Sequence, residues 1–472
     1  MSRSKQLIKN FFAYGFAEAI SKIMPFLCLP IITRMMPDTA AFGVFNLFTI
    51  VNGIGVALIV LSLNTVIFRE YFERDDRQYK CDVTTTAQRI VFYNSIFISL
   101  VLIVFNQFFS QLFFNDTQYS IVIVFSGISV FLTSNEYLIE APTKLQNQRR
   151  TYIYSKILSS CGYYAILLLL IYLGFTYYSI IFTSIFTALL LIVYFWIKNH
   201  HFFLCGKFDK VIAKNLLKIG IPLLPASIMY WVYSAISTIM ISRFLDLSEL
   251  GIYSFGLKIA RIGHVLTAVL MGGLTHFIFS SMKDRDYSVL MGKLFETMLV
   301  FTTICYLTIF LLKGVIFQLL FTGDYLQGIV VFPYLLFVPL LGFLKYIFLT
   351  QFTVIKKPIY HFVFIFIDCL ALTALSYFLI SDHGIVGVAI ANVCASFISF
   401  LLLLILVVLK MKLINLSKYT YLLISIFTLV FSMINYLKAG IVSNIVIFSY
   451  LGIVSLLYYK RVLKFIGSFK DR

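Results

Sequence analysis

Long apolar stretches follow one another through nearly the whole chain, with short polar turns between them. Most are about 20 residues or longer, enough for a helix to cross a hydrocarbon core about 30 Å thick. A membrane barrel would instead show alternating strands of about 10 residues. The pattern therefore predicts an all-α integral membrane protein with fourteen spans, near residues 11–33, 42–67, 88–109, 118–139, 153–173, 177–197, 216–242, 250–279, 295–312, 328–352, 359–380, 384–409, 419–437 and 440–459.

The composition agrees with this prediction and gives the chain an orientation. Mean hydropathy is +0.95, and only 12% of residues are charged, against about 25% in soluble domains. The net charge of +18 would suggest nucleic-acid binding in a soluble protein, but here Lys and Arg lie mainly in alternate loops. Only Arg34, Arg243, Lys313 and Lys438 lie in loops on the other side. By the positive-inside rule we expect both termini in the cytoplasm and no nucleic-acid partner.

Several turns recur at a spacing of about 208 residues. The outward turn Arg34 to Phe45 and the turn Arg243 to Tyr253 both run from Arg through an acidic residue to Gly-aliphatic-aromatic. The basic turns Gln148 to Tyr152 and Ile355 to Tyr360 are a second pair. Their common order predicts a six-helix unit used twice with parallel topology. The alternative is a chance likeness of short hydrophobic turns.

The repeat also predicts how the chain is divided. We expect an N-lobe of spans 1–6 in residues 1–205 and a C-lobe of spans 7–12 in residues 206–412. Residues 413–472 then carry spans 13 and 14 and a cytoplasmic tail. The first span follows a short basic segment without a small-residue cleavage site, so we expect it to be retained as a helix.

Charged residues inside the apolar stretches are the candidate functional residues. A charge at mid-membrane costs at least about 2.5–3.5 kcal/mol and usually faces protein or a water-filled cavity. Lys258 and Arg261 share one face of span 8, and no acidic residue of that span neutralises them. An Arg fork beside a Lys point charge suits phosphate oxygens, so we predict an anion site there. The alternative is a carboxylate partner from another helix.

Four further charges have two interpretations each. Glu18 and Lys22 lie four residues apart in span 1, where they either pair or, for Lys22, add to the cationic site. Lys345 in span 10 either joins that site or reaches the cytoplasmic interface. Asp368 in span 11 either pairs with Lys258, Arg261 or Lys345 or carries a proton. We thus assign Lys22, Lys258, Arg261 and Lys345 to substrate binding, and Glu18 and Asp368 to ion coupling or charge pairing.

No sequence motif indicates catalysis or a resident cofactor. The chain lacks nucleotide-binding, nucleophile-elbow and zinc-protease motifs, so we expect a protein that is not an enzyme and needs no metal. The seven cysteines include no CxxC and no paired spacing. We expect them all to be free thiols, including Cys81 and Cys205 in cytoplasmic loops.

The chain resembles the polysaccharide flippases of the MOP superfamily, most closely the Wzx-type O-antigen or repeat-unit branch. The features that carry this resemblance are two six-helix halves with two extra helices, the paired Arg…Gly turns, the basic turn at residues 146–152, and the segment His-Gly-Ile-Val-Gly-Val-Ala-Ile-Ala at 383–391. The resemblance implies a V-shaped pair of bundles with a cationic central cavity. It also implies alternating access and coupling to protons or sodium ions.

The resemblance implies a particular cargo and location. The cargo would be an oligosaccharide on undecaprenyl pyrophosphate, and the partners would be membrane lipids, a polysaccharide polymerase and the chain-length machinery. The location would be the bacterial inner membrane. The alternatives are a small-molecule exporter of the same superfamily and a flippase for another lipid-linked precursor.

Overall fold

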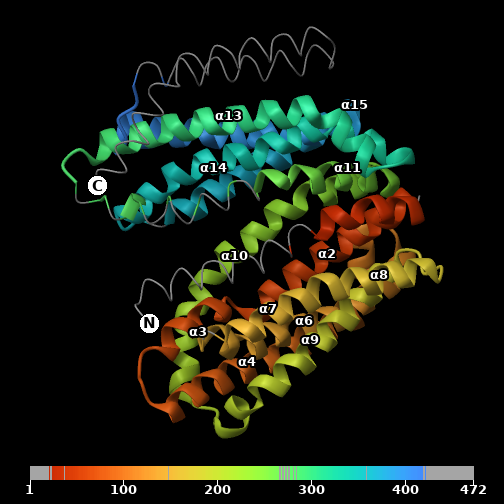
Figure 1. The fold of residues 1–472 in the computed structure, drawn as a ribbon, viewed down its shortest axis with the longest axis vertical. Helices are drawn as coiled ribbons and strands as arrows, with labels where there is room; N and C mark the ends of the chain where they lie inside the picture. Colours follow the sequence, from red (N-terminus) through yellow and green to blue (C-terminus); the bar gives the residue numbers. More distant parts are fainter. Residues whose placement is uncertain are drawn as a thin grey trace. The chain divides into compact units, whose positions relative to one another are not determined.

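The computed structural model of the chain describes residues 21, 24–36, 38–146, 148–264, 267, 271, 274, 277–279, 281–282, 284–357, 359–417 and 420. These residues form helices and turns, with no strand among them (Figure 1). Nine of the described helices are long and apolar enough to cross a membrane. The predicted class, an all-α integral membrane protein, is confirmed.

The predicted spans match the helices closely. The nine long helices cover spans 2–7 and 9–12, with spans 11 and 12 joined in the helical run Ile359–Lys410. The shorter helix Met24–Met35 covers the second half of span 1, and α11, Leu247–Ala260, covers the start of span 8. Spans 13 and 14 lie outside the described residues, so the total of fourteen stays a prediction.

The chain forms two compact units. Unit 1 comprises Met1–Ser254 with Leu320–Tyr325, and unit 2 comprises Phe255–Leu319 with Leu326–Arg472. This division falls later in the chain than the lobe boundary predicted at residue 205, and the lobes of six spans each stay a prediction.

Helix α6 is the centre of the packing of α2, α4 and α9 in unit 1, and α10 packs on α2 (Figure 1). Helix α6 contacts α2, α4 and α9. A π-helical turn, Leu158–Gly162, joins α7 to α8 within one span. The helices of unit 1 are α2 Thr39–Val60, α3 Leu63–Tyr71, α4 Arg77–Val104, α5 Asn106–Phe114, α6 Ser120–Leu145, α7 Arg149–Ile157, α8 Tyr163–Tyr172, α9 Tyr178–Cys205 and α10 Lys210–Phe244.

Span 2 is broken near its C-terminal end, which the sequence did not suggest. Leu61 and Ser62 have φ values of 51° and 59°, so α2 ends and α3 begins there. The break leaves the last carbonyls of α2 without helical donors, which is costly in a membrane. The Asn94 amide from α4 donates to the carbonyls of Leu58 and Ile59 at 3.0 and 2.9 Å. Asn94 therefore offsets part of the energetic cost of the break.

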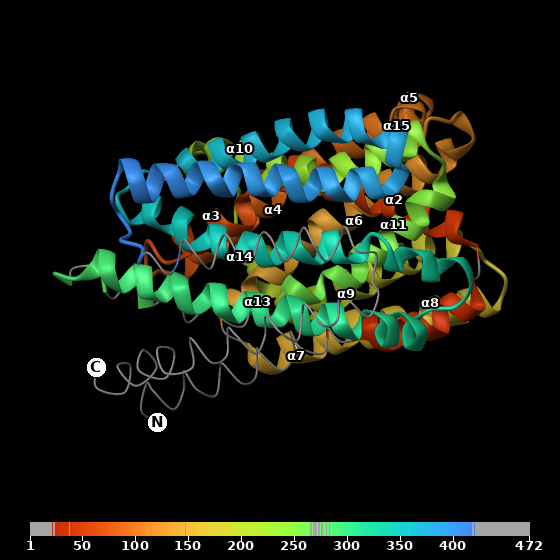
Figure 2. The same cartoon turned by 90° about the horizontal axis from the view of Figure 1, so that it is seen from above.

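Unit 2 contains α13 Tyr287–Leu320, α14 Phe332–Val354 and α15 Ile359–Leu404, and α14 packs against α15 (Figure 2). Helix α15 bends at Gly384, whose φ of 53° and ψ of −137° are not helical. This glycine lies where the sequence predicted the turn between spans 11 and 12. Only glycine adopts this backbone conformation easily.

The sequence repeat is visible as a reciprocal contact inside unit 1. A Cβ on Gly43 of α2 would overlap the backbone of Leu247, and a Cβ on Gly251 of α11 would overlap the backbone of Thr39. The Thr39 and Ser248 hydroxyls, 209 residues apart, hydrogen-bond to each other. Repeat-equivalent residues thus meet each other, as they do across a two-fold axis.

The expectation of seven free cysteines was wrong. Cys81 in α4 and Cys205 at the end of α9 form a disulfide across 124 residues. Spacing along the sequence could not show that these two helix ends pack together. The Thr85 hydroxyl of α4 donates to the Phe202 carbonyl of α9 at 3.2 Å, and Gly206 lies directly against the Cys81 backbone. The other five cysteines are free thiols.

We expect Cys205→Ser to lower the midpoint of thermal unfolding by a few degrees in detergent without reductant. A cross-link over a loop of about 100 residues stabilises a soluble protein by roughly 4–5 kcal/mol. The effect should be smaller here because membrane insertion already confines the spans. A thiol reductant should lower the midpoint of the wild type and leave Cys205→Ser unchanged. Cys161→Ser, at a free thiol, is the control, and an equal effect of reductant on both variants would contradict the prediction.

Candidate functional site

The two cations of span 8 lie where α11 ends. Helix α11 stops at Ala260, and Arg261 lies in a turn whose amide donates to the Leu257 carbonyl at 3.1 Å. Gly256 and Gly263 hold this segment close to the start of α14. A Cβ on Gly256 would lie 2.6 Å from Val331, and one on Gly263 would lie 2.9 Å from Pro339.

The contact of Gly256 and Gly263 with α14, here called the glycine seam, determines where the face with Lys258 and Arg261 points. Successive helical residues are about 100° apart, so Lys258 and Arg261 lie on the side opposite Gly256 and Gly263. Lys258 is half-buried with its ammonium 4.9 Å from the centre of the Phe255 ring, and Arg261 is exposed. The structure therefore brings the two predicted cations together on a face that does not pack against α14.

This face has the chemistry to bind an anion. A guanidinium offers several N–H donors in a fixed fork, and an ammonium one turn away adds a mobile charge. Together they match phosphate oxygens. Among the described residues there is no group of three or more His, Cys, Asp or Glu that could hold a metal ion.

Lys345 and Asp368 form a closed buried network with Ser399 in unit 2. The Lys345 ammonium lies 2.6 Å from Asp368 Oδ2 and donates to Ser399 Oγ at 2.6 Å. Ser399 Oγ donates in turn to Asp368 Oδ1 at 2.6 Å. Lys345 and Asp368 are 7% and 8% exposed and Ser399 is fully buried, so the charges satisfy one another away from water.

This network answers one question that the sequence left open. Of the three cations considered as partners for Asp368, the structure places Lys345 against it. Asp368 and Ser399 both belong to α15, so within unit 2 the Lys345 ammonium faces α15. Its assignment to substrate binding stays a prediction, and the geometry favours a structural role.

Glu18 and Lys22 lie outside the described residues. Their pairing, and the contribution of Lys22 to a cationic site, stay predictions.

Unit 1 has a polar hollow of about 300 Å³ where α3 and α4 meet the end of α9. Its lining includes Asp75, Arg77, Lys80 and His201. Asp75 and Lys80 form an ion pair. The hydrogen bond and positive charge of Lys80 lower the pKa of the Asp75 carboxyl below its usual value. Arg77 is the other Lys, Arg, Asp or Glu in the described lining of the hollow.

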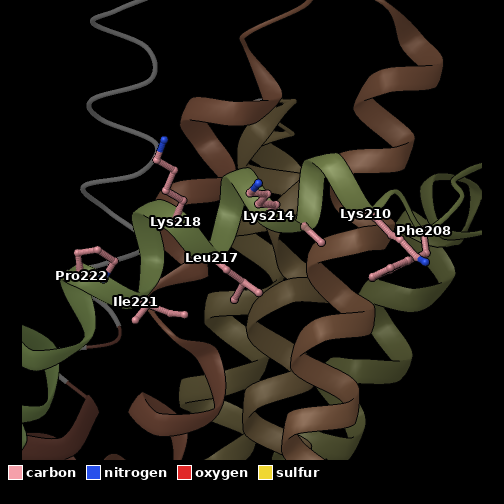
Figure 3. Close-up of a pocket in the computed structure, with 8 residues that line it drawn as sticks. Phe208, Lys210, Lys214, Leu217, Lys218, Ile221 and Pro222 are labelled. Atoms are coloured by element: carbon pink, nitrogen blue, oxygen red, sulfur yellow. The ribbon is translucent and has the colours of Figure 1, made fainter.

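A second hollow lies along the first turns of α10 (Figure 3). Lys210, Lys214 and Lys218 line it together with apolar residues. In the sequence these lysines contribute to the positive-inside bias. Their spacing of four residues, one per turn, was the signal that placed them on one face.

The chain matches the model of the polysaccharide biosynthesis protein family over residues 31–325. No curated protein sequence matches it. Among solved structures it is similar to "Lipid II flippase MurJ, inward closed conformation", with TM-score 0.71, 14% identity, and coverage of 97% of this chain and 100% of that one. It is also similar to an inward-facing multidrug resistance MATE family transporter of the MOP superfamily (TM-score 0.61, 12% identity, 84% and 94% coverage). A third match is the Vibrio cholerae MATE transporter VcmN in the bent form (TM-score 0.51, 13% identity, 87% and 98% coverage).

These matches show both a fold and a family. Its fold is that of MOP-superfamily transporters, a class of multi-pass helical membrane proteins. Within that class the chain belongs to the polysaccharide biosynthesis protein family, whose model covers more than half of its length. The predicted resemblance is confirmed for the polysaccharide biosynthesis family and for the fold.

Proposed function

We propose that this protein flips undecaprenyl-pyrophosphate-linked oligosaccharide repeat units, of the O-antigen or capsule type, across the bacterial inner membrane. Both termini would lie in the cytoplasm. The family and the fold support transport of a lipid-linked precursor in general. The protein would act as a transporter and not as an enzyme, alongside a polysaccharide polymerase and the chain-length machinery.

The observation that carries this proposal is the cationic face of α11. Lys258 and Arg261 point away from the glycine seam, and residues 250–279 contain no other Lys, Arg, Asp or Glu. The energetic cost of such charges is offset when they bind an anionic cargo. Pyrophosphate is the anionic part of the proposed cargo, and its oxygens suit an Arg fork and a Lys ammonium.

The physical problem that a flippase solves fits this arrangement. An oligosaccharide cannot cross hydrocarbon unaided, because each unpaired polar group costs several kcal/mol. A polar path between two repeated lobes removes that cost, while the lipid tail stays in the bilayer. The lobes would open to one side at a time by rocking, as repeated halves of transporters do.

The driving force would be a proton or sodium gradient, with no bound cofactor. Asp368 and Glu18 are the deep carboxylates that could couple transport to an ion. Asp368 already has two partners in Lys345 and Ser399. An ion-coupling role for it therefore requires this network to open during transport.

The second candidate function is export of small cationic molecules; one structure with this fold is a multidrug resistance transporter. An exporter of cations needs an acidic cavity, since opposite charges attract in a low-dielectric site. The two cations of α11 favour an anionic cargo instead. Flipping of another lipid-linked precursor stays open, because the cations would bind any pyrophosphate.

The decisive test is transport of a pyrophosphate-linked oligosaccharide in proteoliposomes. We expect Lys258→Gln/Arg261→Gln to reduce translocation at least about tenfold, because hydrogen bonds to charged groups contribute roughly 1.5–3 kcal/mol each. Arg285→Gln/Lys293→Gln is the matched control, since it removes the same charge from exposed positions of unit 2.

Each other outcome points to a different conclusion. Unimpaired translocation in the α11 variant would make its cations structural. A wild type that exports cationic dyes and moves no lipid-linked sugar would replace this proposal with the exporter.

A further inference from the structure

The first turns of α10 carry an exposed basic face. Lys210, Lys214 and Lys218 are all exposed and are spaced one turn apart, over about 12 Å of helix. No carboxylate among the described residues forms a salt bridge with them. The neighbouring acid, Asp209, caps the helix by accepting from the Val211 amide at 2.6 Å. The three charges are therefore available to a ligand.

The opposite face of α10 packs within unit 1. Ile212, Leu216 and Gly220 are buried, and a Cβ on Gly220 would lie 2.6 Å from the Leu61 carbonyl. This contact turns the three lysines away from the core of unit 1. They are consequently not needed to hold the helix in place.

The basic face is one side of an open groove of about 630 Å³ (Figure 3). Its apolar lining comes from Phe208, Ala213, Leu217, Ile221 and Pro222. Phe208, Ala213 and Leu217 alternate with the lysines along the chain, and beyond Lys218 the lining is apolar only, with Ile221 and Pro222. The groove thus has a cationic end and an apolar end.

The groove lies where α10 enters the apolar part of its span. Lys218 is the last charged residue before Arg243, so the charge bias places the lysines at the cytoplasmic headgroup level. Pro222 has no N–H, so the Lys218 carbonyl loses its helical donor and can accept a hydrogen bond in the groove. A cationic end at the headgroups and an apolar end in the hydrocarbon match the two halves of a lipid.

We propose that this groove binds an anionic glycerophospholipid of the cytoplasmic leaflet. Its phosphates would lie on Lys210, Lys214 and Lys218, and one acyl chain would lie along Leu217 and Ile221. Basic sites at the cytoplasmic ends of membrane helices bind such headgroups. This inference does not depend on the transported cargo.

The spacing of the lysines favours a phospholipid over a polyprenyl pyrophosphate. The two phosphates of a pyrophosphate share one bridging oxygen, so they span less than one helical turn, whereas the lysines extend over two turns. A diphosphatidylglycerol headgroup separates its two phosphates by a glycerol and fits the longer row. Its free hydroxyl could donate to the Lys218 carbonyl.

The test is titration of the purified full-length protein with diphosphatidylglycerol, with bound lipid counted by native mass spectrometry. Each cation contributes about fivefold to such binding, so Lys210→Gln/Lys214→Gln/Lys218→Gln should weaken it about ten- to hundredfold. The control Lys356→Gln/Lys357→Gln/Lys410→Gln removes the same charge from exposed positions of unit 2 and should change the affinity less than about twofold.

A second variant tests the apolar end of the groove separately. Leu217→Gln/Ile221→Gln should weaken binding of diphosphatidylglycerol several-fold while leaving binding of water-soluble glycerophosphate unchanged. We expect every variant to keep the unfolding midpoint of the wild type, which would show that it folds.

Two results would overturn the proposal. An equal loss in both triple variants would mean that net charge alone attracts the lipid. Preferential binding of undecaprenyl pyrophosphate over diphosphatidylglycerol would make the groove a substrate site. Binding lost only in the α10 variants supports the phospholipid, whether or not the protein proves to be a flippase.

Discussion

Lys345→Met should destabilise the protein by about 3–5 kcal/mol, because removing one partner of a buried ion pair leaves the other charge uncompensated. Asp368 would keep only Ser399, 2.6 Å away, in a site where it is 8% exposed. The measurement is the free energy of unfolding in mixed micelles by denaturant titration. Lys293→Met, at an exposed position of α13 in the same unit, is the control and should change stability by less than about 0.5 kcal/mol.

A double-mutant cycle separates a structural role of this pair from a role in ion coupling. Replacing both charges by apolar residues of similar volume is often neutral or stabilising. We therefore expect Lys345→Met/Asp368→Leu to recover most of the lost stability. If the recovered protein also flips its cargo with the same dependence on the ion gradient, Asp368 is not the coupling residue. If Lys345→Met alone leaves stability unchanged, the network does not stabilise the fold.

The spans could be predicted because they depend on apolar length alone. Helices 39–71, 287–320 and 332–354 each enclose a long apolar stretch, and no knowledge of the neighbouring helices is needed to find them. The break at Leu61 and Ser62 could not be predicted in this way. It depends on Asn94, which lies on another helix and supplies the missing donors. The Cys81–Cys205 disulfide was missed because it too depends on which helix ends meet.

For the candidate site too, the sequence could predict which residues share a face but not which residues they contact. Helical periodicity placed Lys258 and Arg261 on one face, and the structure adds the direction of that face through Gly256 and Gly263. Two glycines seven residues apart are a signal of close helix packing that the sequence reading did not use. Only the structure identifies the partner of Asp368, because the sequence does not distinguish among the three candidate cations.

The repeat predicts that the stability of the protein depends more strongly on Gly43 and Gly251 than on other helical glycines. Each lies against the backbone of the other's helix, at Leu247 and Thr39. A backbone cannot move aside as a side chain can, so the two helices must separate to admit a Cβ. We expect Gly43→Ala and Gly251→Ala each to cost about 1–3 kcal/mol of unfolding free energy, the usual range for overpacking.

The two substitutions should also be coupled. Once one added Cβ has separated α2 from α11, the second meets less resistance, so the double variant should cost less than the sum of the single ones. Gly314→Ala is the matched control in α13, because a Cβ there meets nothing within 4 Å. It should leave stability unchanged or raise it by up to about 1 kcal/mol, since Ala favours helices over Gly. Additive losses at Gly43 and Gly251 would show that the two glycines act at independent contacts, and the reciprocal crossing of the two repeats would be wrong.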